Sequence, residues 1–579
     1  MTRLFGYLRR YRARYAVGGA CLLVTASLAM AVPYLLKHAI DAIQRGEPFR
    51  VAAQLAAAIV GIALVQAVTR TLSRALIFNV GRDVERDLRG DLFAHLQRLP
   101  VSYYQNQQTG DLMSRLVNDV TAIRMLLGVG VLNLVNTPIY YAYGVTIMLT
   151  IDPLLTVLSL LPFPLLLLMV KRVSRKLMEQ TLRVQEGLAS LSSAVQENIS
   201  GIQVVKAYGA EDVAVARFAA LNDDFTRQSI ELARVRGRLM PLMRLAAGAG
   251  TLVVLWVGGW QVIGGRIGLG DLVAFIGYLN LLAWPTMALG WMLSIVQRGR
   301  AALQRLEHIF ATVPAIADAP DATPLPAVRG DVEFRHVTFA YPNPDNGHPV
   351  VNDLSFTLAA GQKLGIVGRT GAGKSSLVQL LPRLFDVAEG AVLLDGRDVR
   401  TLPLAQLRRA VCVVPQDPFL FSRRIRDNIA FGLDAPDPAT VERAAAVAGV
   451  AADIEAFPQG YDTVIGERGI TLSGGQKQRL TLARAIAATP RVLVLDDALS
   501  SVDTRTEHAI LEHLREAMGG CTSIVIAHRV STVMDADHIA VVDDGRIIEF
   551  GTHAALLARD GLYAELYRQQ QLEEEIEAL

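Results

Sequence analysis

Residues 368–375 read Gly-Arg-Thr-Gly-Ala-Gly-Lys-Ser and fit the pattern G-x-x-x-x-G-K-[ST], which is typical of a loop that binds nucleotide phosphates. In such a loop the backbone N–H groups and the lysine hold the phosphates. We therefore expect Lys374 to reach the β- and γ-phosphates and Ser375 to ligate Mg²⁺. An apolar run at 363–367 precedes the loop and a helical pattern follows it, as a phosphate loop requires. The predicted binding residues are Gly368, Arg369, Thr370, Gly371, Ala372, Gly373, Lys374, Ser375 and Ser376.

A second chemical pattern follows the loop along the chain. Residues 492–496 read Val-Leu-Val-Leu-Asp, which is typical of a buried strand that ends in a carboxylate. Downstream of a phosphate loop, a carboxylate in this place suits a second contact to Mg²⁺, and we expect Asp496 to make it. The alternative is a buried strand with a capping aspartate, which would be favoured if the pattern stood alone.

The first half of the chain is predicted to cross a membrane. Hydrophobic residues make up 51% of the sequence. Six stretches are long and apolar enough to span a bilayer: residues 16–36, 51–68, 131–150, 154–170, 245–263 and 272–296. An even number of spans places both termini on one side, and the nucleotide-binding half requires that side to be the cytosol. The arginine-rich start agrees, and a cleaved signal peptide is disfavoured because the apolar run that follows is too long.

Composition disfavours other classes of protein. The net charge of +2 is too small to indicate a nucleic-acid partner. The three cysteines have no C-x-x-C spacing and no pairing pattern, so we expect unpaired thiols in a reducing compartment.

The two inner connections between spans, 69–125 and 171–240, are long, charged and compatible with helices. The charges of residues 82–89 cannot lie in hydrocarbon at tolerable cost, so we expect the spanning helices to continue into the cytosol. They are predicted to turn near 100–104 and 206–211. Turns that face an ATPase are candidate transmission points, although plain hairpin tips are the alternative.

Past residue 312 the pattern changes. Residues 313–326 are rich in proline and alanine, which marks a linker. Short β-rich runs then alternate with helical ones, which is the pattern of an α/β domain with a largely parallel sheet. We predict a membrane all-α domain of six helices with long cytosolic extensions at 1–312, a linker at 313–326, and an α/β P-loop domain at 327–579.

Residues 472–476, Leu-Ser-Gly-Gly-Gln, carry a resemblance to a known family. With the patterns above, the chain resembles ATP-binding cassette (ABC) transporters, and within them exporter-type half-transporters with six spans and one cassette. In that family this signature begins a helix whose N-terminus binds the γ-phosphate of ATP held by the opposite cassette. The resemblance implies ATP and Mg²⁺ as cofactors. It further implies a signature contact by Ser473, Gly474, Gly475 and Gln476, adenine stacking by Tyr341, a Mg²⁺-sensing role for Gln416, an interface role for Asp503, and a switch role for His528.

One position departs from the family pattern. The residue after Asp496 is usually the glutamate that polarises the attacking water, and here it is Asp497. Aspartate has a similar pKa but is one methylene shorter, by about 1.5 Å. A misplacement of about 1 Å can cost on the order of a hundredfold in rate. In the resembling family, aspartate here often marks the slow site of a heterodimer, so we expect a heterodimer rather than a homodimer.

The resemblance implies ATP-driven export or flipping of hydrophobic or amphiphilic small molecules or lipids across the cytoplasmic membrane by alternating access. Catalysis would involve Asp497, His528 and Gln416, and Mg²⁺ would contact Ser375, Gln416 and Asp496. The expected partner is a second half-transporter chain. The alternatives are a homodimeric lipid flippase, an exporter-fold importer and, less favoured because of the six apolar stretches, a soluble ABC ATPase.

Overall fold

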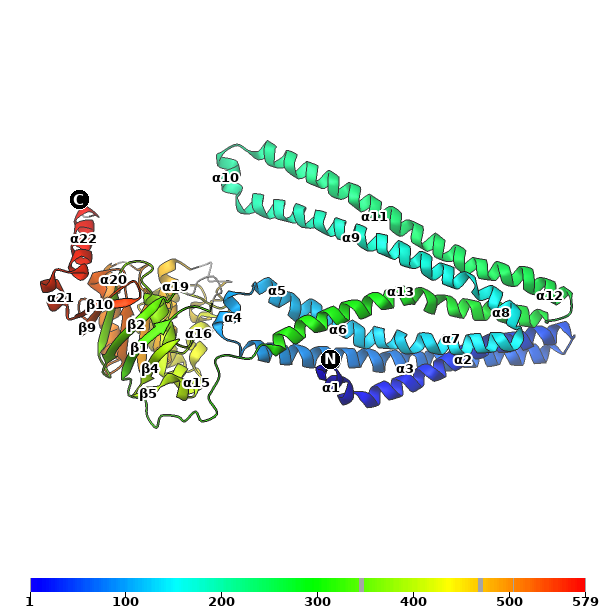
Figure 1. The fold of residues 1–579 in the computed structure, drawn as a ribbon, viewed down its shortest axis with the longest axis horizontal. Helices are drawn as coiled ribbons and strands as arrows, with labels where there is room; N and C mark the ends of the chain where they lie inside the picture. The colour runs from blue at the N-terminus through cyan, green and yellow to red at the C-terminus, as the bar shows by residue number, and fades with distance from the viewer. Residues whose placement is uncertain (1, 343–347, 467–471, 503, 578–579) are drawn as a thin grey trace. The chain divides into compact units, whose positions relative to one another are not determined.

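The computed structural model describes residues 2–342, 348–466, 472–502 and 504–577. Its contacts divide the chain into two compact units, one formed by Met1–Leu96 and Gly110–Ala311 and the other by Gln97–Thr109 and Thr312–Leu579. The first unit is helical, and the second mixes helices and strands (Figure 1).

The helices of the first unit are long. Their bounds are α1 (Thr2–Arg10), α2 (Arg12–Gln44), α3 (Phe49–Leu96), α5 (Thr109–Ser114), α6 (Val120–Met125), α7 (Val131–Ile151), α8 (Pro153–Leu160), α9 (Pro162–Ser200), α10 (Ile202–Ala207), α11 (Glu211–Val253), α12 (Gly259–Ile263) and α13 (Leu269–Ala311). Three π-helical turns continue them: η1 (Arg115–Asp119), η2 (Leu126–Gly130) and η3 (Val254–Gly258). At 1.5 Å per residue α3 is about 70 Å long, more than twice the ~30 Å hydrocarbon core of a bilayer. The predicted extension of the helices beyond a bilayer is therefore confirmed in length.

Four helical stretches are individually long and apolar enough to cross a membrane: Arg12–Gln44, Phe49–Leu96, Thr109–Ile151 and Leu269–Ala311. They contain four of the six predicted spans. The other two, 154–170 and 245–263, correspond to shorter apolar stretches in the described residues, Pro153–Pro164 and Gly248–Ile263. Near the first of these, α8 ends at Leu160 and Pro162 begins a new helix, so the apolar run is divided between two helices.

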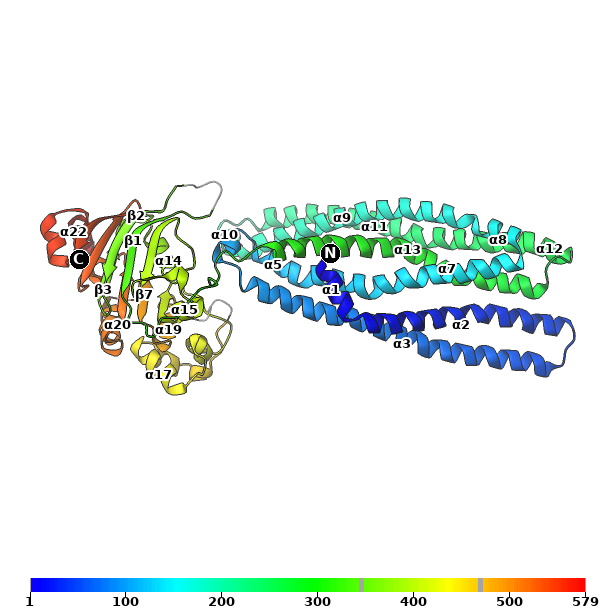
Figure 2. The same cartoon turned by 60° about the horizontal axis from the view of Figure 1, so that its bottom comes forward.

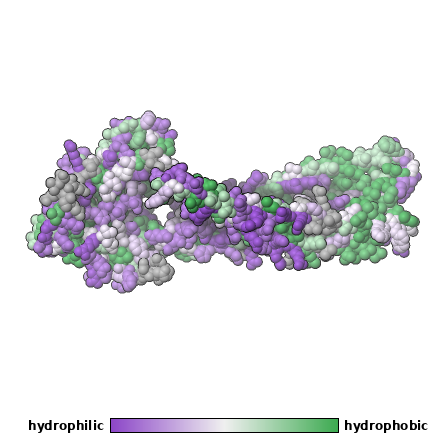
Figure 3. Space-filling model, turned by 90° about the horizontal axis from the view of Figure 1, so that it is seen from above, coloured by the Kyte–Doolittle hydropathy of each residue, from purple (hydrophilic) through white to green (hydrophobic). Residues whose placement is uncertain are grey.

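On the face shown in Figure 3, apolar residues gather at the end of the helical unit that holds α8 and α12, and hydrophilic residues predominate along the rest of its length. Large apolar side chains exposed at the apolar end include Leu64, Val157 and Trp260. A soluble protein buries most such side chains, whereas a lipid-facing surface exposes them.

Ion pairs join the helices where they are hydrophilic. Arg305 of α13 donates two hydrogen bonds to Asp119 in η1, at 2.8 Å and 2.5 Å, and only 10% of the Asp119 side chain is exposed. Arg14 of α2 pairs with Asp83 of α3 at 2.5 Å. The arginine-rich start is thus held by acidic residues of α3, which keeps this end of the unit polar.

Both predicted turning points are short helices. α4 (Val101–Gln105) follows the end of α3, and α10 (Ile202–Ala207) joins α9 to α11, which pack side by side (Figure 1). Pro100 precedes α4 and disfavours helical backbone in the residue before it. Gly209, with φ of +59°, follows α10 and allows the chain to reverse. The predicted positions of these turns are confirmed.

The second unit contains two sheets (Figure 2). Its strands are β1 (Val332–Phe339), β2 (Val351–Leu358), β3 (Lys363–Val367), β4 (Glu389–Leu394), β5 (Arg397–Asp398), β6 (Val411–Val414), β7 (Val492–Asp496), β8 (Thr522–Ile526), β9 (His538–Asp543) and β10 (Arg546–Gly551). The core sheet has the order β10-β9-β3-β8-β7-β6 and is parallel except for β10. This confirms the predicted parallel core.

The antiparallel sheet β2-β1-β4-β5 was not expected. Its strands alternate buried and exposed residues, as in a sheet with one face exposed to solvent. On the buried face, Phe334 of β1 stacks on Phe356 of β2 with ring centroids 4.7 Å apart. The helices of this unit are α14 (Lys374–Leu380), α15 (Leu404–Ala410), α16 (Ile425–Ile429), α17 (Pro438–Val447), α18 (Ala451–Glu455), α19 (Gly474–Ala487), α20 (Thr504–Ala517), α21 (His553–Arg559) and α22 (Leu562–Glu577).

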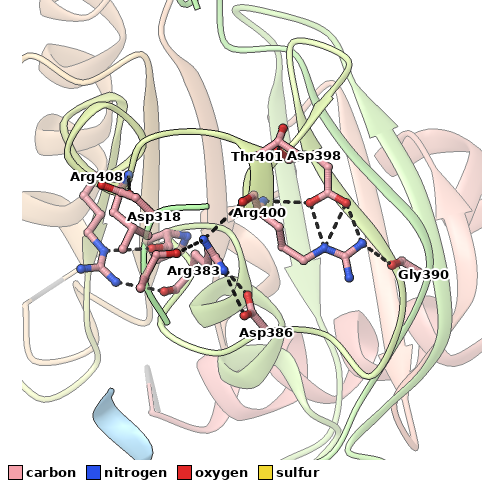
Figure 4. Close-up of polar contacts among 11 residues, drawn as sticks. Asp318, Arg383, Asp386, Gly390, Asp398, Arg400, Thr401 and Arg408 are labelled. Carbon is pink, nitrogen blue, oxygen red and sulfur yellow. Dashed lines mark hydrogen bonds and ion pairs between the residues drawn. The ribbon is translucent and has the colours of Figure 1, made fainter. Parts of the chain in front are cut away.

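The linker is attached to the second unit by specific hydrogen bonds. Arg383, whose side chain is only 8% exposed, donates to the Ala317 carbonyl at 3.1 Å and forms a bidentate pair with Asp386 (Figure 4). Asp318 accepts from the backbone N–H of Leu404 at 2.7 Å. Further along, the Gln406 amide pairs with both backbone groups of Leu325. Most of the predicted linker therefore lies along the α/β unit.

Candidate nucleotide-binding site

The phosphate loop lies between β3 and α14, as the sequence pattern predicts. Gly368 has φ of +153°, and a Cβ there would lie 2.0 Å from the Val542 carbonyl oxygen. Gly373, with φ of +93°, precedes α14, and a Cβ there would lie 2.5 Å from the Val350 carbonyl oxygen. Glycine is thus required at both ends of the loop by close backbone approach and not only by flexibility.

Lys374 and Ser375 are oriented by contacts within the site. The Lys374 ammonium donates to the carbonyls of Gly368 and Arg369 at 2.7 Å and 2.9 Å, which leaves one of its three N–H groups. The Ser375 hydroxyl donates to Asp496 Oδ1 at 2.9 Å. The structure therefore brings together the loop and the carboxylate at the end of β7.

Burial sets the electrostatics of this pair. Asp496 is 5% exposed, and this burial raises the pKa of its carboxyl group, with a further upward effect from neighbouring Asp497. Burial likewise lowers the pKa of Lys374. Both shifts reflect charges that lack full solvation. A phosphate group beside Lys374 and a cation beside Asp496 would each favour the charged form again.

The donor set suits Mg²⁺. Ser375 and Asp496 offer a hydroxyl and a carboxylate oxygen that already converge to 2.9 Å, and Mg²⁺ prefers such oxygen ligands, with phosphates and water completing its shell. Gln416, the third predicted metal contact, has its amide hydrogen-bonded to Asp497. Within the described residues no group of three or more His, Cys, Asp or Glu residues could hold a metal.

Asp497, Gln416 and His528 lie at the ends of three neighbouring strands of the core sheet. Gln416 Nε2 donates to Asp497 Oδ2 at 3.3 Å. Asp497 and His528 both line a cavity of about 70 Å³. Asp497 has φ of +48°, and its backbone N–H donates to the Ile526 carbonyl at 2.9 Å. The left-handed backbone is tolerated best by short polar side chains such as aspartate.

Tyr341 is near the loop, as the resemblance implies. Its hydroxyl is 2.9 Å from the Ser376 hydroxyl, and its ring meets those of Phe339 and Phe385 edge to face. The ring is therefore fixed beside the first turn of α14.

The signature residues begin α19. The Ser473 hydroxyl accepts from the backbone N–H of Gln476, and the Gln476 side chain accepts from the backbone N–H of Ser473. This capping box stabilises the helix N-terminus. Gln476 also donates to Asp453 at 2.9 Å. None of the hydrogen bonds described for Ser473, Gly474, Gly475 or Gln476 reaches the phosphate loop, while Asp503 lies outside the described residues.

Three residues that sequence reasoning missed support these segments. Gln478 donates to the Ser500 hydroxyl and accepts from the backbone N–H of Ser501, so it joins α19 to the segment after β7. Glu507 and Gln570 contact the segment that carries His528. Gln478 adjoins the signature and could have been considered for that reason, whereas no local pattern marks Glu507 or Gln570.

Two family models match the chain. One, described as the ABC transporter transmembrane region, matches residues 15–286, and the other, described as ABC transporter, matches residues 351–500. The multidrug resistance-like ATP-binding protein MdlA of Escherichia coli is 39% identical over 99% of this chain and 97% of its own length. The ATP-dependent lipid A-core flippase of Syntrophus aciditrophicus is 34% identical over 99% of this chain and 95% of its own. A solved structure of a bacterial Atm1-family ABC exporter with ATP bound, 31% identical, superposes with a TM-score of 0.80 and covers 97% of this chain and 99% of its own.

Proposed function

Since the chain belongs to the ABC transporter family, with a helical transmembrane domain followed by a nucleotide-binding domain, we propose that it exports or flips hydrophobic or amphiphilic molecules across the cytoplasmic membrane at the expense of ATP. The observation that carries this proposal is the Ser375–Asp496 pair beside the phosphate loop, in a chain whose other half exposes long apolar helices.

The chain's own residues divide the work of hydrolysis. The remaining N–H of Lys374 binds phosphate oxygens, and the backbone N–H groups of the loop help to hold them. Ser375 and Asp496 would hold Mg²⁺, which would supply positive charge to neutralise the phosphates. Asp497, held by Gln416, orients the attacking water, and His528, which lines the same cavity, acts as the switch residue beside the γ-phosphate. Tyr341 stacks on the adenine.

We further propose that two cassettes must meet. Ser473 and its neighbours cap α19 without reaching the phosphate loop, so a second chain's signature would complete this chain's site. The short side chain of Asp497 favours a heterodimer. In it this chain would supply the carboxylate of the slower ATP-hydrolysis site and, to the partner's site, an intact signature. Asp503 would lie at the contact between the cassettes.

Alternating access would link ATP hydrolysis to movement of the transported molecule. ATP binding closes the cassettes, and the turning points at α4 and α10 transmit the closure to the spanning helices. Both termini and the cassette would face the cytosol. Residues 1–312 would form the membrane domain, 313–326 the linker and 327–579 the cassette.

A second candidate is a homodimeric lipid flippase. It is favoured by the 34% identity to a lipid A-core flippase along almost the whole chain. An importer with the same fold has no comparable support.

The test uses the purified chain in proteoliposomes loaded with ATP, beside Lys374→Ala. One set carries a fluorescent cationic amphiphile and the other a headgroup-labelled phospholipid, and each is followed by quenching. ATP-dependent movement that Lys374→Ala abolishes supports the proposal, and the label that moves separates export from flipping. ATP hydrolysis without movement of either label in any lipid mixture would contradict it.

Assembly is measured in the same preparation. Mass photometry in nanodiscs gives the number of chains per particle. A chain that stays monomeric and hydrolyses ATP only after a second half-transporter is added supports the heterodimer, whereas a dimer that hydrolyses ATP alone supports the homodimer.

A further inference from the structure

Gln570, in the last helix, holds both sides of the peptide segment that carries His528. Its Nε2 donates to the His528 carbonyl at 2.5 Å, and its Oε1 accepts from the backbone N–H of Val530 at 2.6 Å. One side-chain amide therefore pairs with a donor and an acceptor two residues apart, as a neighbouring strand would. Such an arrangement fixes the backbone on both sides of Arg529.

The helix that presents Gln570 is itself anchored. Tyr563 is fully buried in the main apolar core of the unit, and Tyr567 packs partly against the same core. Positions 563, 567 and 570 have the spacing of one helix face, so the packing of Tyr563 and Tyr567 directs Gln570 toward the same side of α22. The Leu562 backbone N–H also donates to Glu549 at 2.6 Å, which fixes the start of the helix.

The same segment is held from its other side by α20. Glu507, only 6% exposed, accepts from the Thr532 hydroxyl at 2.6 Å and pairs with Arg529 at 3.6 Å. Val530, between these contacts, is 1% exposed. The backbone around His528 is thus clamped between α20 and α22, while the His528 side chain itself is exposed.

We infer that Gln570 is a positioning residue for ATP hydrolysis, through which α22 sets the place of His528. This rests on the proposed role of His528. Both polar atoms of the Gln570 side chain hydrogen-bond to this backbone segment, so its effect is assigned to the segment and not to a contact with the nucleotide. Losing it leaves ATP binding by the phosphate loop intact but frees the His528 backbone. A misplacement of about 1 Å at a reacting group can cost on the order of a hundredfold in rate.

The test compares Gln570→Leu, which removes both hydrogen bonds, with Gln570→Glu, which keeps the acceptor for Val530 but loses the donor to His528. Gln571→Leu is the matched control, because Gln571 is the same residue type one position on and is hydrogen-bonded to Tyr567 of its own helix. Each is made in the natural chain and with Asp497→Glu, so that a slow site does not hide the loss. ATPase kcat, KM for ATP and the thermal midpoint are measured in nanodiscs.

We expect both Gln570 variants to lose about tenfold to a hundredfold in kcat with KM unchanged, and Gln571→Leu to match its parent. Added to His528→Ala, Gln570→Leu should have no further effect on the residual rate, because it acts through the histidine.

Parental turnover in the Gln570 variants, while His528→Ala is impaired, would overturn the inference and leave the proposed function standing. Losses that multiply with His528→Ala would also overturn it, because they would indicate a general structural role. If Lys374→Ala and His528→Ala both hydrolyse ATP normally, the proposed function itself fails.

Discussion

Extending the Asp497 side chain by one methylene is predicted to accelerate ATP hydrolysis. The carboxylate now accepts from Gln416 Nε2 at 3.3 Å and faces the cavity shared with His528. Asp497→Glu advances it by about 1.5 Å. If the aspartate falls short of the attacking water by this distance, the gain is up to about a hundredfold in kcat, or ~2.7 kcal/mol.

The same substitution should cost stability. Asp497 has φ of +48°, and a longer side chain gains no local hydrogen bond that offsets left-handed backbone, which costs about 1 kcal/mol. For a unit of this size that corresponds to a fall of about 2–4 °C in the thermal midpoint. The strain is present before and after the chemical step, so it lowers stability without slowing turnover. Opposite signs in rate and stability are therefore expected.

ATPase rates in nanodiscs and thermal unfolding of the same samples measure both effects. Lys374→Ala combined with Asp497→Glu must abolish the rate, which excludes a contaminating ATPase, and Asp497→Asn keeps the shape of the side chain but removes its charge. An unchanged or lower rate in Asp497→Glu would refute the reasoning about reach. The aspartate would then be competent, and the main support for a heterodimer would be lost.

Three further predictions concern buried polar groups. Asp496→Asn should abolish Mg²⁺-dependent hydrolysis yet raise the nucleotide-free thermal midpoint at pH 7. Burial raises the pKa of Asp496, so the stability that the protonated carboxyl contributes is present below its ordinary pKa and is lost as pH rises through the raised pKa. The higher thermal midpoint of Asp496→Asn should therefore disappear near pH 4. Arg383→Leu should lower the free energy of unfolding by about 1–3 kcal/mol, because it removes the hydrogen bonds that the buried guanidinium makes to Asp386 and to the Ala317 carbonyl. Arg409→Leu, which breaks an exposed pair, should cost less than about 1 kcal/mol in urea titrations. Burial raises the pKa of Cys521 to about 11, so its alkylation, followed by peptide mass spectrometry, should rise about tenfold per pH unit above pH 8, and rapid labelling at pH 8 would contradict this.

The sequence was most informative where chemistry imposes local spacing. The loop at 368–375, the strand ending in Asp496 and the parallel core were predictable because glycine, lysine and buried β-branched residues leave short-range patterns. The antiparallel sheet was missed because its strands are half exposed and β4 pairs with β1 across a long stretch of chain. Gln570 was missed for a related reason, since its partners lie about forty residues away in sequence.

Prediction of the membrane-spanning helices from the sequence had a different limit. Hydropathy identified apolar stretches but could not identify where helices divide, as between α8 and α9, or where π-helical turns continue them, as at η3. These depend on proline placement and on packing between helices, which a sliding window over one sequence does not detect.

The attached linker also determines the length of free chain between the end of α13 and the first anchored residue of the linker. Only residues 312–316 lie between the last residue of α13, Ala311, and the carbonyl of Ala317 that Arg383 holds. Fully extended, those six Cα–Cα steps reach about 20 Å. Arg383 in turn follows the end of α14, the helix that begins at Lys374. The free connection between α13 and the anchored part of the linker is therefore short, and moving Ala311 farther than this from Ala317 would require the Arg383–Ala317 hydrogen bond to break.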